Sequence, residues 1–217
     1  MAQRVAGDLY HELDGQLCEL KRQLRQLSGY PFDPLQLREH LQAGIEGRFS
    51  VVRSSLLKPL GTVPVPYVHK FVARRNFIVD TSAGASPKIS YLSDNFPGWF
   101  GDKVEKVPSG TLQYAELLKS SVDGPILAEL GNTAEVTLAN IFALMERQPN
   151  GEKAGALFTN GRANIFYVKD VGGTLRAVDV YWRGDGWDVN AYSVSSPDRW
   201  RDGNRVFSRN SSATLTA

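Results

Sequence analysis

Two aspartates near the C-terminal end of the chain, Asp179 and Asp188, have the spacing of a carboxylate pair on one face of a β-hairpin. If Trp182 faces Trp187 across a four-residue turn, the aspartates are diagonal neighbours with backbones roughly 7–8 Å apart. Inverting glycosidases hold their two carboxyl groups at a similar separation. Three side chains on the same face would suit a sugar: Tyr181, Asn190 and Tyr192. The pattern therefore leaves open a hydrolase, a non-catalytic ligand surface and a solvated sheet face.

A third carboxylate, Asp80, follows a short apolar run in Phe77–Ala83. This run resembles the active-site strand of retroviral-type aspartic proteases, which implies that Asp80 shares a proton with a second carboxylate and that Thr81 supports the pair. Ser82 stands where that family has glycine, and the sequence holds no second copy. A protease would therefore require a symmetric dimer, and the alternative is a strand that ends in a polar turn.

Basic and aromatic residues alternate around Lys70, Arg74 and Arg75, with Phe71 and Phe77 between and after them. Phosphate contacts and base stacking need these residue types. The net charge of the chain is only +2, however. Nucleic-acid binding is therefore one hypothesis, and a salt-paired surface with buried aromatic rings is its alternative.

Metal and cofactor chemistry have little support in the sequence. Three histidines, His11, His40 and His69, are far apart, and the single cysteine, Cys18, lies on a leucine-rich helix. Zinc sites need about four closely spaced ligands, and no phosphate-binding glycine loop is present. We predict no metal and no cofactor.

The C-terminal sheet must position the hairpin aspartates. Strands are expected at 163–169, 174–182 and 187–194, separated by turn-rich residues. On the core face we expect the following side chains: Ile165, Tyr167, Val178, Val180, Val189 and Ala191. The opposite face then receives Phe166 and Val168 together with the aspartates and tyrosines.

The first 47 residues predict a helical hairpin. Leucines recur at 9, 13, 17, 20, 24 and 27, and a second stripe follows Asp33-Pro34 at Leu37, Leu41 and Ile45. A leucine face that its own chain leaves uncovered tends to pair with a copy of itself. The hairpin could also lie on the rest of its own chain. A homodimer, or a protein partner bound through this hairpin, is the favoured expectation.

Between these regions the elements are shorter. Residues 58–67 contain three prolines and predict a connector, with strands at 68–72, 77–79 and 89–92 beyond it. Helices are expected over 111–118 and over 132–147, the latter begun by Asn132 and Glu135 as a capping box.

Composition and compartment agree with this outline. The chain has 217 residues, 42% of them hydrophobic, and one cysteine. No apolar run approaches the roughly 20 residues needed to cross a bilayer, and the start of the chain lacks a signal-peptide pattern. We predict a cytoplasmic protein without contact to membranes.

Residues 76–209 resemble a group of uncharacterised bacterial proteins. The resemblance is carried by five segments: 89–96, 123–126, 141–145, 164–168 and 206–209, together with Trp182 and Trp187. It implies that this region is one folded unit, and it implies no activity or catalytic residue.

The predicted fold class is α+β: an N-terminal helical hairpin followed by an α+β unit that ends in a C-terminal antiparallel β-meander. The expected divisions are a hairpin at 1–47, a proline-rich connector at 48–67 and an α+β domain at 68–217. Because each catalytic constellation lacks a member, a non-catalytic binding or assembly module is favoured. The alternatives are nucleic-acid binding and a hydrolase.

Overall fold

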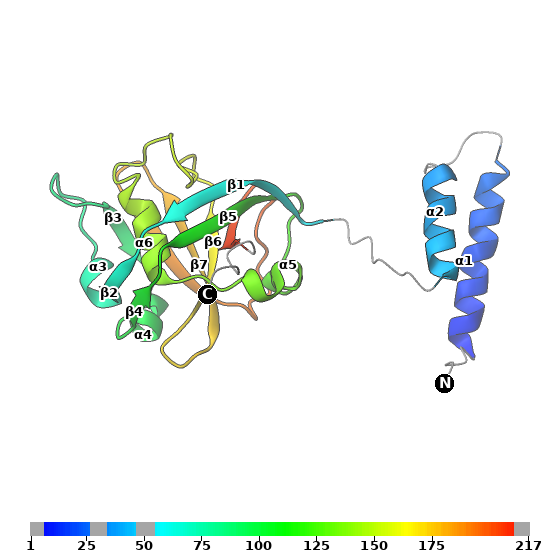
Figure 1. Ribbon diagram of the computed structural model, residues 1–217, viewed down its shortest axis with the longest axis horizontal. Coiled ribbons are helices and arrows are strands. Elements are labelled where there is room, and N and C mark those ends of the chain that lie inside the picture. The colour runs from blue at the N-terminus through cyan, green and yellow to red at the C-terminus, as the bar shows by residue number, and fades with distance from the viewer. Residues whose placement is uncertain (1–6, 27–33, 47–54, 211–217) are drawn as a thin grey trace. The chain divides into compact units, whose positions relative to one another are not determined.

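The computed structural model describes residues 7–26, 34–46 and 55–210, and it confirms an α+β fold. The chain divides into two compact units, Met1–Val52 and Arg53–Ala217. We refer to them as the helical unit and the sheet unit, and we describe each by itself (Figure 1).

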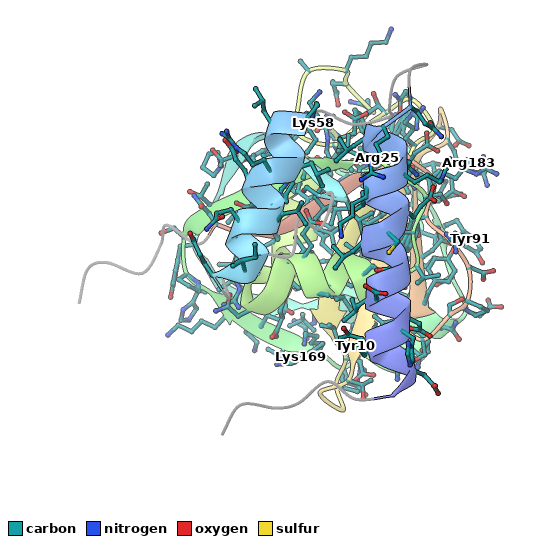
Figure 2. The ribbon with its side chains drawn as sticks, turned by 90° about the vertical axis from the view of Figure 1, so that its right-hand side faces the viewer. Tyr10, Arg25, Lys58, Tyr91, Lys169 and Arg183 are labelled. Carbon is teal, nitrogen blue, oxygen red and sulfur yellow. The ribbon has the colours of Figure 1, made fainter. Side chains whose placement is uncertain are left out.

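The helical unit contains helix α1, Asp8–Leu24, and helix α2, Pro34–Ile45, as the leucine spacing predicts. Figure 1 shows the two helices side by side, and Figure 2 labels Tyr10 and Arg25 near the two ends of α1. The predicted cap Asp33 and the leucine at position 27 lie outside the described residues. No residue whose side chain the structure describes in these helices is buried.

The sheet unit is built on a seven-stranded sheet with the order β1-β5-β9-β6-β7-β8-β3. The strands are β1 (Leu57–Val65), β3 (Ile89–Leu92), β5 (Gly110–Leu117), β6 (Asn164–Lys169), β7 (Leu175–Trp182), β8 (Trp187–Ser193) and β9 (Arg205–Arg209). β6 runs parallel to β9, and β3 runs parallel to β8, whereas the other neighbours are antiparallel. A two-stranded sheet pairs β2 (Val68–Val72) with β4 (Val104–Val107).

Helices cover both faces of the large sheet. They are α3 (Ala73–Asn76), α4 (Asn95–Phe100), α5 (Asp123–Leu130), a 3₁₀ turn at Gly131–Thr133, and α6 (Leu138–Glu146). One core contains α6 with Phe166, Val178 and Phe207, and the other contains α5 with Tyr167 and Val206. Residues 138–145 of α6 are all buried, and all of them except Asn140 are apolar, as expected for a helix enclosed within a core.

The register of the C-terminal meander is partly as predicted. β7 and β8 pair Val180 with Val189 and Val178 with Ala191, which confirms that these residues share the core face. Across β6 and β7 the prediction was wrong. Phe166 opposes Val178 and shares its face, whereas Ile165 and Tyr167, predicted on that face, point to the other side of the sheet.

The length of the turn between β6 and β7 explains this error. Lys169 opposes Leu175, so the turn holds five residues, 170–174, whereas the prediction assumed two or four. The carboxylate of Asp170 accepts hydrogen bonds from the backbone of Gly172 and Thr174 at 2.9 Å and stabilises the longer turn. An odd number of turn residues reverses which side chains face the core.

Several shorter elements also differ from the predictions. Leu57–Val65, expected within the connector, forms the strand β1 at the edge of the large sheet. An edge strand tolerates proline, because the side of the strand that faces no neighbour needs no N–H donor. The register with β5 shifts between Pro59 and Gly61. The helix expected at 111–118 is β5, which pairs on both sides with β1 and β9. Residues 77–79, expected as a strand, are irregular, and Ile78 and Val79 are exposed.

Helix α6 begins later than predicted. Its N-cap is Thr137, whose side chain accepts from the backbone N–H of Asn140, and the Asn140 side chain completes the capping box. Asn132 and Glu135, predicted in this role, lie before the helix. Instead, the backbone of Glu135 pairs with that of Tyr167 in β6 as an isolated parallel β-bridge.

Candidate functional site

The five residues predicted to share a polar sheet face do lie on one face of β7 and β8. Asp179 opposes Asn190, Tyr181 opposes Asp188, and Tyr192 opposes Ala177 one step further along. β3 brings a residue that the sequence did not suggest, because Tyr91 opposes Asp188 in the parallel pairing. Figure 2 shows Tyr91 and Arg183 extending outward from this part of the sheet.

Asp188 is already occupied by neighbouring side chains. Its two carboxylate oxygens accept hydrogen bonds from the Arg183 guanidinium at 2.8 Å and from the Ser90 hydroxyl at 2.7 Å. Arg183 also donates to the Tyr181 hydroxyl at 2.7 Å. Both oxygens of this carboxylate are therefore already engaged by side chains of the same sheet unit.

Asp179 lies beneath the surface, with only 4% of its area exposed. Its Oδ1 atom has no hydrogen-bond partner among the described residues. Burial raises the pKa of this carboxyl to about 7, the nearby charge of Asp188 adds to the rise, and the Asn190 side chain opposes it. The two aspartates are thus brought together but not presented to a substrate, and the geometry does not support the hydrolase hypothesis.

Asp80 does not form a protease dyad with any described residue. Its Oδ1 atom accepts a hydrogen bond of 2.8 Å from the backbone N–H of Ser82, which holds the pKa of Asp80 below its ordinary value. The side chain is exposed, and the backbone of Asp80 pairs with that of Ile89 in an isolated antiparallel β-bridge. A protease dyad requires a second carboxylate within reach, and none of the described residues supplies one, so the alternative, a polar turn, describes this site better.

The basic segment does not offer stacking surfaces for nucleic acid. Phe71 and Phe77 are each 4% exposed and pack edge to face inside the core. Arg74 forms an ion pair with Asp102 and donates to the carbonyl of Gly101. Lys70 and Arg75 remain exposed, but without aromatic partners they form an ordinary charged surface.

Neither metal ligands nor membrane segments stand out. Within the described residues, no group of three or more His, Cys, Asp and Glu side chains could hold a metal ion. His11, His40 and His69 are exposed, as is Cys18. No helix in the described part of the chain is long and apolar enough to cross a bilayer.

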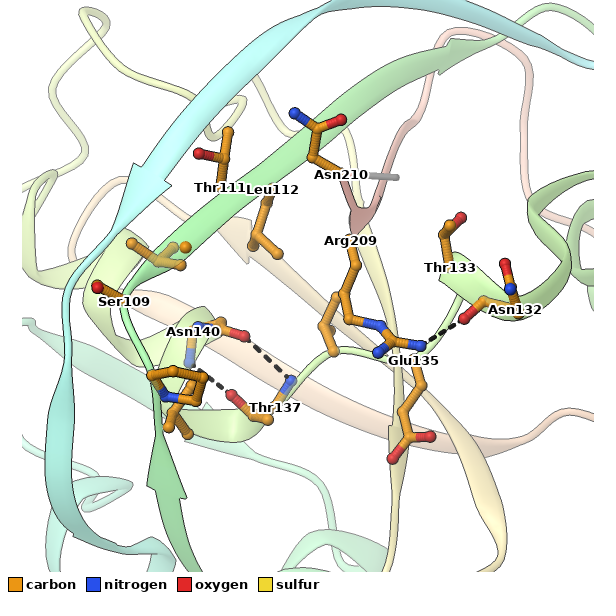
Figure 3. A pocket seen from close by; sticks show the side chains of 15 residues that line it. Ser109, Thr111, Leu112, Asn132, Thr133, Glu135, Thr137, Asn140, Arg209 and Asn210 are labelled. Carbon is orange, nitrogen blue, oxygen red and sulfur yellow. Dashed lines mark hydrogen bonds between the residues drawn. The ribbon is translucent and has the colours of Figure 1, made fainter. Parts of the chain in front are cut away.

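A groove that sequence reasoning missed opens at one end of the large sheet, with a volume of about 650 Å³ (Figure 3). β9 pairs with β6 only at Arg205 and Val206, and further along β6 the backbone N–H of Val136 bonds to the carbonyl of Tyr167 instead. The groove lies where these two partners of β6 separate. It is lined by the end of β1, residues 107–112, residues 132–137 with Asn140, and residues 209–210.

Two charged side chains line this groove, Arg209 and Glu135. Glu135 is paired with Lys169 at 2.9 Å. Arg209 donates to the backbone carbonyl of Asn132, a neutral acceptor, and Figure 3 shows its guanidinium reaching across the groove. The sequence gives little sign of this site, because its residues come from four separate segments and none belongs to a recognisable motif.

The hydroxyl groups around the groove lack the partners that catalysis needs. Ser109, Thr111, Thr133 and Thr137 line it, but no histidine or cysteine does. Nucleophilic hydroxyls require an adjacent base within hydrogen-bond reach.

Comparison with known proteins adds no relative. No protein-family model matches the chain, and no curated protein or solved structure is significantly similar to it. The resemblance of residues 76–209 to a bacterial group stays a prediction.

Proposed function

We propose that the protein is a non-catalytic binding and assembly module that forms a homodimer through its helical unit, in the reducing cytoplasm that its single cysteine predicts. The observation that carries this proposal is the exposure of the leucine stripes. Leu17 is 46% exposed and Ile45 is 81% exposed, although both stand at the apolar positions of their helices.

Helices of this length need an external packing surface. Isolated helices shorter than about 12–15 residues are marginal in water. α2, with 12 residues, lies at this limit, and α1, with 17, is only slightly longer. Most helical stability in proteins comes from burying an apolar face. Since no side chain described in the helical unit is buried, a second copy would supply the missing surface.

The charges of α1 favour a second copy in antiparallel orientation. The first part of the helix carries Asp8, Glu12 and Asp14, and its last turn carries Lys21 and Arg22, of which Arg22 is already paired with Glu19 at 2.7 Å. In an antiparallel two-fold pair that places Leu17 of one copy beside Leu20 of the other, the acidic part faces the basic part twice. Two-fold symmetry of this kind is the commonest way in which identical chains associate.

Leu17→Glu in the full chain is expected to weaken dimerisation roughly 100-fold or more, because it places a charge in the apolar interface. The matched control is Cys18→Glu, which introduces the same residue one position along, on the other side of α1. Sedimentation equilibrium over a concentration series measures both, and circular dichroism checks that helix content is retained.

The wild-type chain and Cys18→Glu should dimerise alike, and Leu17→Glu should be monomeric at the same concentration. A wild-type chain that stays monomeric throughout the series contradicts the proposal. Equal weakening by the two substitutions also contradicts it, because the leucine face would then have no special role.

A further inference from the structure

We propose that the groove of the sheet unit binds a small organic molecule with one carboxylate and an apolar body, and that the guanidinium of Arg209 pairs with the carboxylate. This binding site is distinct from the dimerisation proposed for the helical unit, and it depends on no residue of that unit.

The floor of the groove is apolar. Four of its lining residues are hydrophobic and only 2–6% exposed: Val65, Val107, Leu112 and Val136. The rim is polar, with the threonines, Asn132 and Arg209. An apolar floor with a few convergent polar groups, in a volume between about 300 and 1,000 Å³, is the usual anatomy of a small-molecule site.

The charge of the groove selects an anion. Of its two charged residues, Glu135 is neutralised by Lys169 at 2.9 Å. Arg209 makes no ion pair within the part of the chain that the structure describes, and its one hydrogen bond there goes to a backbone carbonyl. Most N–H donors of its planar fork therefore remain for a ligand, and this fork matches the two oxygens of a carboxylate.

A phosphate fits the same groove less well. The N-terminus of α6 lines it, but the backbone N–H groups of Leu138 and Ala139 already donate to the carboxylate of Glu105 at 3.2 and 2.9 Å. The N–H of Asn140 donates to Thr137. The helix end thus has no free donors in its first turn for an anion, and the buried Glu105 would repel a doubly charged group. One guanidinium, with no second positively charged side chain among the described residues that line the groove, suits a single negative charge.

The test uses octanoate as the probe with the full chain. Two control compounds separate the contributions of the two parts of octanoate. Octan-1-ol keeps the apolar body without the carboxylate, and acetate keeps the carboxylate without the apolar body. Inorganic phosphate tests the competing anion. Isothermal titration measures affinity, and amide chemical shifts locate the site. We expect octanoate to bind more tightly than the other three, with shifts at Thr111, Leu112, Thr133 and Val136.

The variants are Arg209→Gln, which removes the charge, and Arg209→Lys, which keeps the charge and loses the planar fork. Arg209→Gln should weaken octanoate roughly 10-fold or more, and Arg209→Lys should weaken it less. Arg201→Gln, at another exposed arginine, should leave affinity unchanged. Because Arg209 is itself exposed, its replacement should not unfold the chain, and the amide spectrum of each variant confirms this.

Three results would overturn the proposal. The first is unchanged octanoate affinity in Arg209→Gln. The second is phosphate or acetate binding as tightly as octanoate. The third is the absence of octanoate-induced shifts at the groove residues, including the case in which octanoate shifts only the leucine faces of the helical unit. Each of these leaves the dimerisation experiment unaffected.

Discussion

Asp179→Asn is expected to raise the free energy of unfolding at about pH 8 by ~2–4 kcal/mol, because it removes a charge that the fold buries without adequate partners. The wild-type carboxyl is buried, and its pKa is raised from 3.8 to about 7, chiefly by this burial. Asparagine has nearly the same shape and keeps one oxygen as an acceptor for Asn190.

The sign of the pH dependence follows from that shift. Between the unfolded pKa of 3.8 and the folded pKa of about 7, the folded protein holds a proton that the unfolded chain has released. Rising pH therefore favours unfolding over this window. The contribution of Asp179 to stability is fully present below the unfolded pKa and is lost as the pH rises through the folded pKa.

Urea unfolding of the wild type and of Asp179→Asn across pH 4–8, followed by the tryptophan fluorescence of the chain, measures this difference. The two curves should lie closest at the acidic end and diverge towards pH 8. Asp185→Asn, at an exposed aspartate in the β7–β8 turn, is the control and should show no such divergence. A gap between the wild type and Asp179→Asn that does not change with pH would show that the carboxyl is ionised throughout.

The second large effect is expected at Glu105, whose carboxylate caps α6 from the neighbouring two-stranded sheet. Glu105→Ala should lower the free energy of unfolding by about 2–4 kcal/mol, because it leaves the buried N–H groups of Leu138 and Ala139 without acceptors. Lys103, 3.7 Å from the Glu105 carboxylate, would also lose its partner. α6 supplies much of one core, so its loosening should also disturb the groove beside it.

Chemical denaturation of Glu105→Ala measures this loss. The neighbouring exposed residue of β4, Lys106, provides the control as Lys106→Ala, which should change stability by no more than about 0.5 kcal/mol. Equal destabilisation by the two substitutions would mean that β4 itself is sensitive to alanine and that the cap contributes nothing special. Retained stability in Glu105→Ala would show that solvent or the Thr137 cap satisfies the helix end.

The local pattern of the sequence determined the elements that need only their own residues. Leucine spacing placed α1 and α2, and β-branched and aromatic runs placed β2 and β3 at their observed bounds. The four-residue turn at 183–186 set the register of β7 and β8, and with it the shared face of Asp179 and Asp188. In each case the decisive interactions lie within a few residues or across one tight turn.

Only the tertiary structure decided the features that join distant segments. β5 is a strand and not a helix because β1 and β9 pair with its two edges. Both carboxylate oxygens of Asp188 are held in hydrogen bonds because Ser90 and Arg183 reach them, and burial on the sheet raises the pKa of Asp179. Periodicity assigns a side chain to a face but says nothing about what will cover that face.

The groove and the α6 cap show the same limit most clearly. Glu105 reaches a helix that begins at Leu138, and the groove exists because β9 and the 132–137 segment part from β6 at different points. No window of the sequence contains both sides of either arrangement. The sequence by itself therefore determined helices α1 and α2, three strands of the meander and one polar face. The fold decided which charges are paired, which are buried, and where a cavity opens, because these depend on contacts between residues far apart in the chain.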